Sequence, residues 1–222
     1  MIMKIKGIIF DFDGLILDTE TSEVLIWEKV FQQFGLIFPL DRYLHNVGHA
    51  TDNHFVHGFM RDLGLSNDEI EFAISEYEKL FSNSGFLDNP REGIREIIQS
   101  ARDSGLKLGI ASNSYRIWVS GHLRNLNLEH FFDPVCTRDD VSNSKPDPEL
   151  YNLVLRNWGF LPQEVFVFED SPNGILAAKN AGMYCIAVPN PLTVNMDISK
   201  ADLIFNSFME IDLHEIVCNF EE

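Results

Sequence analysis

The chain alternates short apolar runs with longer stretches in which apolar residues recur at helical spacing. The short runs are candidate strands and cover residues 6–10, 106–112, 133–137, 165–169, 183–188 and, more weakly, 201–205. Between them, helical stripes include one formed by Ile94, Ile97, Ile98 and Ala101. This alternation is typical of a parallel sheet covered by helices on both faces. We therefore predict an α/β fold with a Rossmann-like, three-layer α/β/α core.

Local signals mark the ends of two of these helices. Gly105 follows the first stripe in the position of a helix C-cap, where glycine tolerates a left-handed backbone. Asp147 and Pro148 precede a second stripe, and they predict an N-cap followed by proline at the first helical position.

The segment from residue 19 to residue 89 breaks the alternation and shows no convincing strand. Val24, Trp27, Val30 and Phe31 share one helical face, and the run from Ser66 to Glu69 is a capping box. We predict a catalytic core made of residues 1–18 and 90–222, with residues 19–89 inserted as an all-helical cap domain.

Composition narrows the class of protein. The net charge of −17 argues against a nucleic-acid partner, although clustered carboxylates can hold a divalent metal and so admit a phosphorylated ligand. No apolar run approaches the roughly 20 residues of a membrane span. With three well-separated cysteines and no leader pattern at the N-terminus, we expect a cytoplasmic protein without membrane partners. A monomer is favoured, although the sequence does not determine the oligomeric state.

Polar groups of complementary chemistry follow four of the predicted strands. In an open parallel sheet, ligands bind beyond the carboxyl ends of the strands. The residues in question are Asp11 and Asp13, Ser112 and Asn113, Lys145, and Glu169 and Asp170. Together they offer a carboxylate nucleophile, a second carboxylate for proton transfer, oxygen ligands for Mg²⁺, and a hydroxyl and an ammonium for phosphate charge. Each residue alone could be a turn, cap or surface residue, but the combination favours phosphoryl transfer.

Four segments resemble, in order, the motifs of the haloacid dehalogenase superfamily. They are residues 11–19 (DFDGLILDT), 111–114 (ASNS), 144–148 (SKPDP) and 168–174 (FEDSPNG). The chain is most similar to the helical-cap subgroup that includes small-molecule phosphatases and β-phosphoglucomutase. The dehalogenase branch lacks the second aspartate, so Asp13 argues against that activity.

The resemblance implies a role for each residue. Asp11 would be the nucleophile, and Asp13 the general acid/base with its backbone carbonyl on the metal. Mg²⁺ would be bound by Asp11, Asp13 and Asp170, with Glu169 orienting the metal's waters. Ser112, Lys145 and Asn113 would bind the transferring phosphate. The implied activity is Mg²⁺-dependent hydrolysis of a small phosphomonoester, foremost a sugar phosphate, through an aspartyl phosphate.

Two other activities stay open. A β-phosphoglucomutase-like enzyme would hold a second phosphate with cationic cap residues, but the matching positions here carry Glu23, Val47 and Thr51. Thr19, Glu23 and His49 are candidate cap or hinge contacts. The third possibility is a non-catalytic member that binds phosphate or a protein, which the retained carboxylates disfavour.

Overall fold

The computed structural model describes residues 4–45, 47 and 54–220. Each predicted strand is present, inside its expected range. The strands are β1 (Gly7–Phe10), β2 (Lys107–Ala111), β3 (Val135–Cys136), β4 (Val165–Glu169), β5 (Tyr184–Ala187) and β6 (Leu203–Ile204). They form one parallel sheet in the order β3-β2-β1-β4-β5-β6. The chain therefore builds outward from β1 in both directions, which places a topological switch point between β1 and β4.

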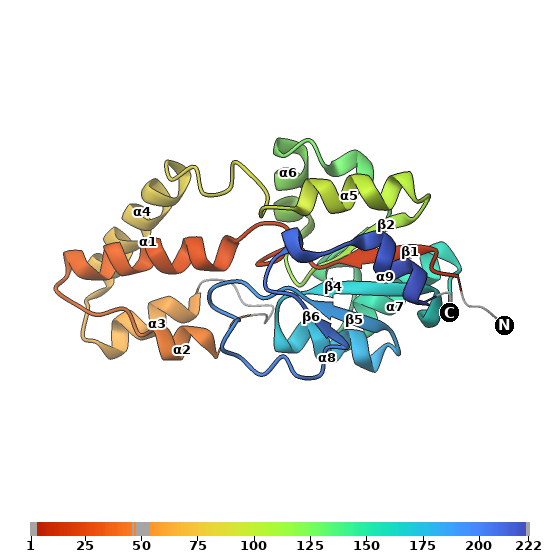
Figure 1. The fold of residues 1–222 in the computed structure, drawn as a ribbon. Helices are drawn as coiled ribbons and strands as arrows, with labels where there is room; N and C mark the ends of the chain where they lie inside the picture. The colour runs from red at the N-terminus through yellow and green to blue at the C-terminus, as the bar shows by residue number, and fades with distance from the viewer. Residues whose placement is uncertain (1–3, 46, 48–53, 221–222) are drawn as a thin grey trace.

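Helices cover both faces of the sheet, as the α/β prediction required (Figure 1). The α-helices that follow the first 90 residues are α5 (Ile94–Asp103), α6 (Arg116–Asn125), α7 (Glu149–Trp158), α8 (Pro172–Asn180) and α9 (Leu213–Phe220). Short 3₁₀ turns are η1 (Glu129–Phe131), η2 (Arg138–Asp140), η3 (Pro162–Glu164) and η4 (Phe208–Glu210). Helices α5, α6 and α9 pack on one face, and α7 and α8 pack on the other.

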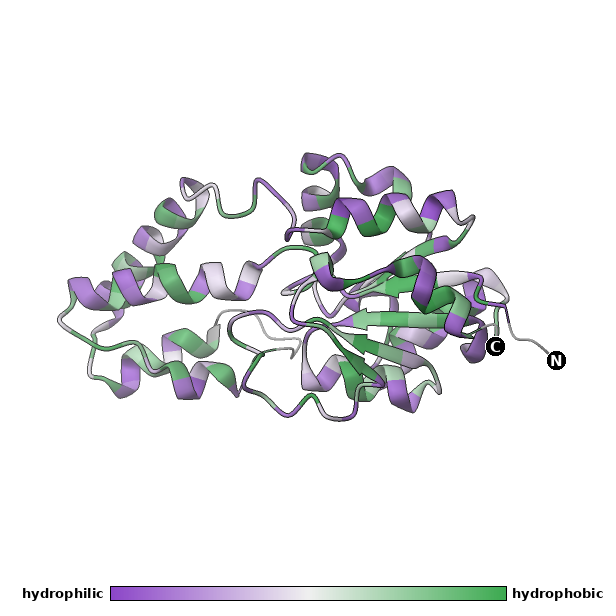
Figure 2. Ribbon diagram, viewed as in Figure 1, coloured by the Kyte–Doolittle hydropathy of each residue, from purple (hydrophilic) through white to green (hydrophobic). Residues whose placement is uncertain are grey.

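The buried strands are apolar on both sides because both sides are covered. In β1, Ile8 and Phe10 face the cluster under α5 and α6, whereas Ile9 faces the cluster under α7 and α8. In Figure 2 the central strands are mostly apolar, and the helices around them carry both apolar and polar positions. The core is thus two apolar layers separated by the sheet.

A second group of helices lies beyond the carboxyl ends of the strands (Figure 1). It consists of α1 (Thr19–Gln33), α2 (Leu40–Leu44), α3 (His54–Asp62) and α4 (Asn67–Ser82). These helices share their own apolar cluster, in which Trp27 stacks on Tyr77 with ring centroids 4.2 Å apart. No strand occurs between residues 19 and 89 wherever that segment is described. The helical cap is therefore present, while its boundaries at residues 19 and 89 stay a prediction.

Helix ends follow the local signals, with one shift. Ser66 and Glu69 form the expected capping box at the start of α4. Gly105 adopts the left-handed backbone, with φ of +73°, after the end of α5. Helix α7 begins one residue later than predicted, because Pro148 rather than Asp147 is its N-cap and the Asp147 carboxylate accepts from the Glu149 N–H. None of the helices in the described part of the chain is long and apolar enough to cross a membrane.

Candidate active site

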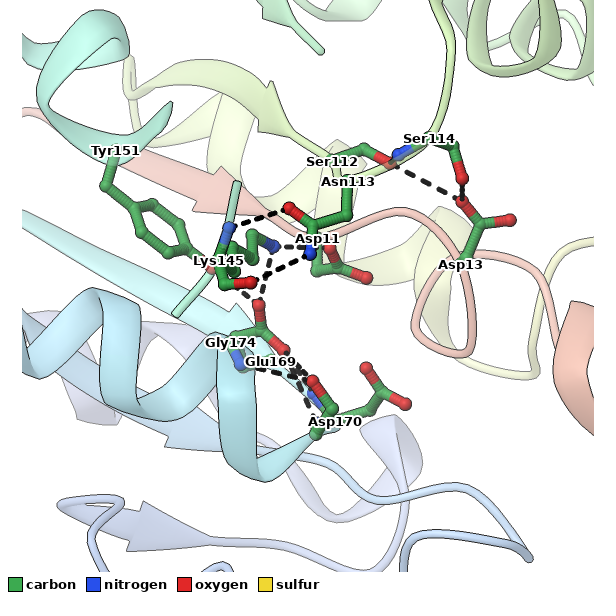
Figure 3. Close-up of polar contacts among 11 residues, drawn as sticks. Asp11, Asp13, Ser112, Asn113, Ser114, Lys145, Tyr151, Glu169, Asp170 and Gly174 are labelled. Atoms are coloured by element: carbon green, nitrogen blue, oxygen red, sulfur yellow. Dashed lines mark hydrogen bonds and ion pairs between the residues drawn. The ribbon is translucent and has the colours of Figure 1, made fainter. Parts of the chain in front are cut away.

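The sheet brings the predicted site residues together at the carboxyl ends of its strands (Figure 3). Strand β1 pairs with β4 so that Phe10 lies opposite Phe168, which places the following residues, Asp11 and Glu169, side by side. Strand β2 lies on the other side of β1, and Ser112 follows it directly. Parallel register therefore gathers residues separated by more than 150 positions in the sequence into one site.

Lys145 links two of the carboxylates. Its ammonium donates to Asp11 Oδ1 (2.5 Å) and to Glu169 Oε1 (2.7 Å), and the side chain is only 3% exposed. Burial alone disfavours the ammonium. The charges and hydrogen bonds of Asp11 and Glu169 outweigh burial and raise the Lys145 pKa above its ordinary value. Lys145 is therefore a fixed cation beside Asp11.

Glu169 is fully buried and accepts hydrogen bonds at both oxygens. Oε1 accepts from the Tyr151 hydroxyl (2.6 Å) as well as from Lys145. Oε2 accepts from the backbone N–H groups of Asp170 (3.0 Å) and Ser171 (3.3 Å). Gly174 is required for this close approach, because a Cβ there would overlap the Glu169 carboxylate. Glu169 is held in one orientation.

Asp170 is also buried, with 1% exposure. Its Oδ2 accepts from the Asn190 side-chain amide (2.8 Å), which belongs to the loop after β5. Burial raises the Asp170 pKa well above its usual range, and the charges of Glu20 and Asp11 add to this effect. Arg91 opposes the shift, but its guanidinium donates to the carbonyls of Gly14 and Val188 rather than to the carboxylate.

The carboxylates fit a divalent cation. One oxygen each from Asp11, Glu169 and Asp170 can be chosen so that all lie within 4.8 Å of one another. Burial raises the Asp11 pKa to about 8, against the opposing charge of Lys145 and reinforced by Glu169. Lys145 thus pairs with two of these three buried acids, Asp11 and Glu169. Hard oxygen ligands in excess of local positive charge are what Mg²⁺ prefers, so the residues present suit this metal.

Asp13 lies at the rim of the site and points toward the β2 end (Figure 3). Its Oδ2 accepts from the Ser114 hydroxyl (2.6 Å) and more distantly from Ser112 Oγ (3.4 Å). Its Oδ1 accepts from the Trp118 indole N–H (2.8 Å). The second carboxylate of the DxD pair is therefore separated from Lys145 and surrounded by neutral donors.

Ser112 and Asn113 follow β2 but differ in their contacts. The buried Ser112 hydroxyl accepts from the Ser114 N–H (3.0 Å) and is directed toward Asp13. The Asn113 amide instead pairs with the Lys145 backbone: Asn113 Oδ1 accepts from its N–H (2.9 Å), and Nδ2 donates to its carbonyl (3.3 Å). Asn113 thus fixes the loop that carries Lys145, and a direct phosphate contact stays a prediction.

A family model for haloacid dehalogenase-like hydrolases matches residues 8–188, which contain every one of these site residues except Asn190. The chain belongs to the haloacid dehalogenase-like hydrolase family. This result confirms the resemblance seen in the four motifs.

Two relatives and one solved structure are similar to this chain over most of its length. YhcW of Bacillus subtilis strain 168, provisionally named a phosphatase, is 39% identical over 209 residues, which cover 94% of each chain. The phosphorylated carbohydrates phosphatase of Thermotoga maritima is 32% identical over 180 residues, 80% of this chain and 82% of that protein. The crystal structure of CbbY from Rhodobacter sphaeroides with phosphate has a TM-score of 0.71 at 26% identity, covering 93% of this chain and 96% of that one.

The three residues predicted as cap or hinge contacts of this haloacid dehalogenase-like hydrolase differ in their surroundings. Thr19 is buried and begins α1, one residue after Asp18, which caps that helix. Glu23 accepts a hydrogen bond from the Tyr43 hydroxyl (2.8 Å) inside the cap. His49 lies outside the described residues.

Glu20, which sequence reasoning missed, lies close to the core carboxylates. Burial raises its pKa to about 8, and the charges of Asp13 and Glu23 add to the shift. Asn190 donates to both Glu20 (3.3 Å) and Asp170 (2.8 Å), so it links the cap helix to the β4 end.

Sequence reasoning also missed Tyr151, Ser114 and Trp118. Ser114 belongs to the same short motif as Ser112, and its spacing could have suggested a polar role. Tyr151 adjoins the predicted apolar stripe of α7, where aromatic residues usually indicate core. Nothing in the local pattern indicates that its hydroxyl reaches Glu169.

Proposed function

We propose that the protein is a Mg²⁺-dependent phosphatase that hydrolyses a small phosphomonoester, foremost a sugar phosphate, through an aspartyl phosphate. One observation carries this proposal. Asp11 is buried at the switch point of the sheet with Lys145 on one oxygen and Asp170 close by. A carboxylate so placed is shielded from competing water, and it has a fixed cation beside it.

In the first step, a carboxylate oxygen of Asp11 attacks phosphorus while the bond to the leaving oxygen breaks. Asp13 gives a proton to that oxygen, so the alcohol departs neutral. In the second step, water attacks phosphorus as Asp13 takes a proton from it. The Asp11–phosphorus bond then breaks, which returns the carboxylate and releases inorganic phosphate.

The surrounding groups hold the charge that moves during these steps. Lys145 and the Ser112 hydroxyl would contact phosphate oxygens, and donors fixed in advance lower the barrier because they need no reorganisation. Asp11, Asp170 and the Asp13 backbone carbonyl would hold Mg²⁺, and Glu169 would orient its waters. When bound, Mg²⁺ supplies the positive charge that lets an anionic nucleophile and an anionic phosphate approach.

The cap side supports a substrate rich in hydroxyl groups. Glu20 is close enough to the core acids for their charges to raise its pKa, Glu23 lies close to Glu20, and each side chain can form a hydrogen bond with an alcohol. Neither side chain offers the positive charge that a second phosphate would need. The named activity of the Thermotoga relative, on phosphorylated carbohydrates, agrees with this substrate class.

The test compares wild type with Asp11→Asn in a screen of phosphorylated metabolites. The substitution is nearly isosteric but removes the nucleophilic charge, so we expect turnover to fall below detection while the fold persists. Circular dichroism and thermal unfolding serve as the control for folding. Activity within about tenfold of wild type would show that Asp11 is not the nucleophile.

A further inference from the structure

The two oxygens of Asp13 meet chemically different donors. Oδ1 accepts from the Trp118 indole N–H at 2.8 Å. Oδ2 accepts from the Ser114 hydroxyl at 2.6 Å and lies 3.4 Å from the Ser112 hydroxyl. Trp118 lies in the first turn of α6, which follows the loop that carries both serines. The carboxyl group is therefore held from both sides by one loop-and-helix segment.

This difference decides which oxygen can carry a proton. An indole N–H is a donor only, so Oδ1 must remain an acceptor while that bond persists. A hydroxyl both donates and accepts, so the Ser114 hydroxyl can satisfy Oδ2 with or without a proton. Oδ2 is also the oxygen nearer Ser112, the proposed phosphate ligand. The proton for the leaving group is thus directed to the oxygen on the phosphate side.

The indole itself is fixed by rings on both sides of the seam between core and cap. His122, one turn along α6, packs edge-on against it, with ring centroids 4.3 Å apart. Phe81 of cap helix α4 also packs near the Trp118 ring, with the two ring centroids 6.4 Å apart. Because the ring is half-buried and packed, its N–H keeps one direction.

We propose that Trp118 is a positioning residue that orients the Asp13 carboxyl for proton transfer to the leaving group. The proposal rests on the proposed function, in which Asp13 is the general acid. It assigns a role to a residue outside the four motifs. It also predicts a selective defect in kcat/KM, which reports the steps up to release of the leaving group, because in those steps only a leaving group that needs a proton depends on this orientation.

The test is Trp118→Phe, which keeps a ring but removes the N–H. Two substrates are compared by kcat/KM: β-glycerol phosphate, whose alkoxide needs a proton, and p-nitrophenyl phosphate, whose phenolate leaves without one. General acid catalysis contributes about 10²–10⁴-fold, so we expect a loss of about tenfold or more with glycerol phosphate and under about threefold with p-nitrophenyl phosphate. Inhibition by inorganic phosphate should not change, because the phosphate ligands are intact.

Trp158→Phe is the matched control. Its indole N–H donates to the Asp133 carbonyl (2.7 Å), so this variant also loses one indole hydrogen bond, away from Asp13. It should leave the ratio of the two kcat/KM values unchanged. Equal losses on both substrates in Trp118→Phe, or no loss, would overturn the proposal. The two proposals fail separately. An active Asp11→Asn variant would overturn the proposed function, whereas the ratio of the two kcat/KM values tests only the role of Trp118.

A second measurement holds even if Trp118→Phe does not fold. In ¹⁵N-labelled protein, Asp13→Ala should move the Trp118 indole N–H resonance and leave those of Trp27 and Trp158 in place. Trp27→Phe and Trp158→Phe assign the three signals. An unmoved Trp118 resonance would contradict the hydrogen bond on which the proposal rests.

Discussion

Asp11, Glu169 and Asp170 concentrate negative charge that one lysine cannot balance. Lys145 contacts the first two, whereas the Asp170 carboxylate accepts a hydrogen bond from the neutral Asn190 amide. Burial raises the pKa of both Asp11 and Asp170, since an unpaired buried carboxylate is costly. A bound divalent cation would remove that cost, so metal binding and catalysis depend on the same residues.

Asp170→Ala should weaken Mg²⁺ without removing the nucleophile. We expect the Mg²⁺ concentration for half-maximal activity to rise by about tenfold or more, the scale on which metal sites respond to a lost ligand or supporting residue. Steady-state rates over a Mg²⁺ titration measure this. Asp147→Ala, at an exposed acidic residue just before α7, provides the control and should leave the titration unchanged. A wild-type response in Asp170→Ala would remove Asp170 from the metal site.

At the scale of secondary-structure elements, strand register positions the site residues, whereas helix capping stabilises the cap. Parallel pairing of β1 with β4 sets Asp11 level with Glu169, while helices α5 to α9 hold the sheet from both sides. The cap helices rely more on local signals. Ser66 begins α4 with a reciprocal capping box, in which its N–H donates to Glu69 at 2.8 Å. That interaction satisfies helix donors without touching the site.

Ser66→Ala should therefore cost stability but not catalysis. Loss of such a cap is worth about 1 kcal/mol, and we expect that decrease in the free energy of unfolding, measured with urea. Ser75→Ala removes an exposed hydroxyl from the middle of the same helix and should be neutral or slightly stabilising. The kcat of both variants should match wild type; a changed kcat in Ser66→Ala alone would mean that α4 acts on the reaction.

For the whole molecule, the buried acids predict a link between pH, metal and stability. Without metal, the Asp11 pKa rises from 3.8 to about 8, with burial as the largest cause. A raised carboxyl pKa contributes stability below the unfolded value and loses it as pH rises through the folded value. The contribution of Asp11 should therefore make the metal-free protein less stable as the pH rises from about 4 to about 8.

Bound Mg²⁺ needs the ionised carboxylate, so it should raise the melting temperature more at about pH 8 than at about pH 6. Calorimetric scans with Mg²⁺ or with a chelator measure the difference. In Asp11→Asn this pH dependence of the metal effect should shrink. A larger increase in melting temperature with Mg²⁺ at the lower pH would contradict this prediction.

The residues on the cap side of the site also bear on the choice between hydrolysis and mutase chemistry. A mutase must exclude water and grip a second phosphate, whereas Glu20 and Glu23 on the cap side are acids rather than the cations that such a phosphate needs. With β-glucose 1-phosphate and catalytic glucose 1,6-bisphosphate, we expect release of phosphate and little glucose 6-phosphate. Coupled enzymatic assays follow both products. Efficient isomerisation without phosphate release would replace the phosphatase proposal with a mutase.

The sequence by itself determined the strands, a few helix ends and the order of the four motifs. Apolar periodicity and capping act over a few residues, so the β4 range and the Ser66 capping box could be predicted locally. The strand-end rule then placed Asp11, Lys145 and Asp170 together, because parallel strands share one carboxyl edge.

Only the tertiary structure decided which side chains hold those acids in place. Tyr151 reaches Glu169 from α7, Trp118 reaches Asp13 from α6, and Asn190 reaches Asp170 from the loop after β5. Each contact depends on how a helix or loop packs against the sheet, and packing angles leave no periodic trace along the chain. The local pattern shows an aromatic or an amide at such a position, but only packing sets the direction of its polar atom.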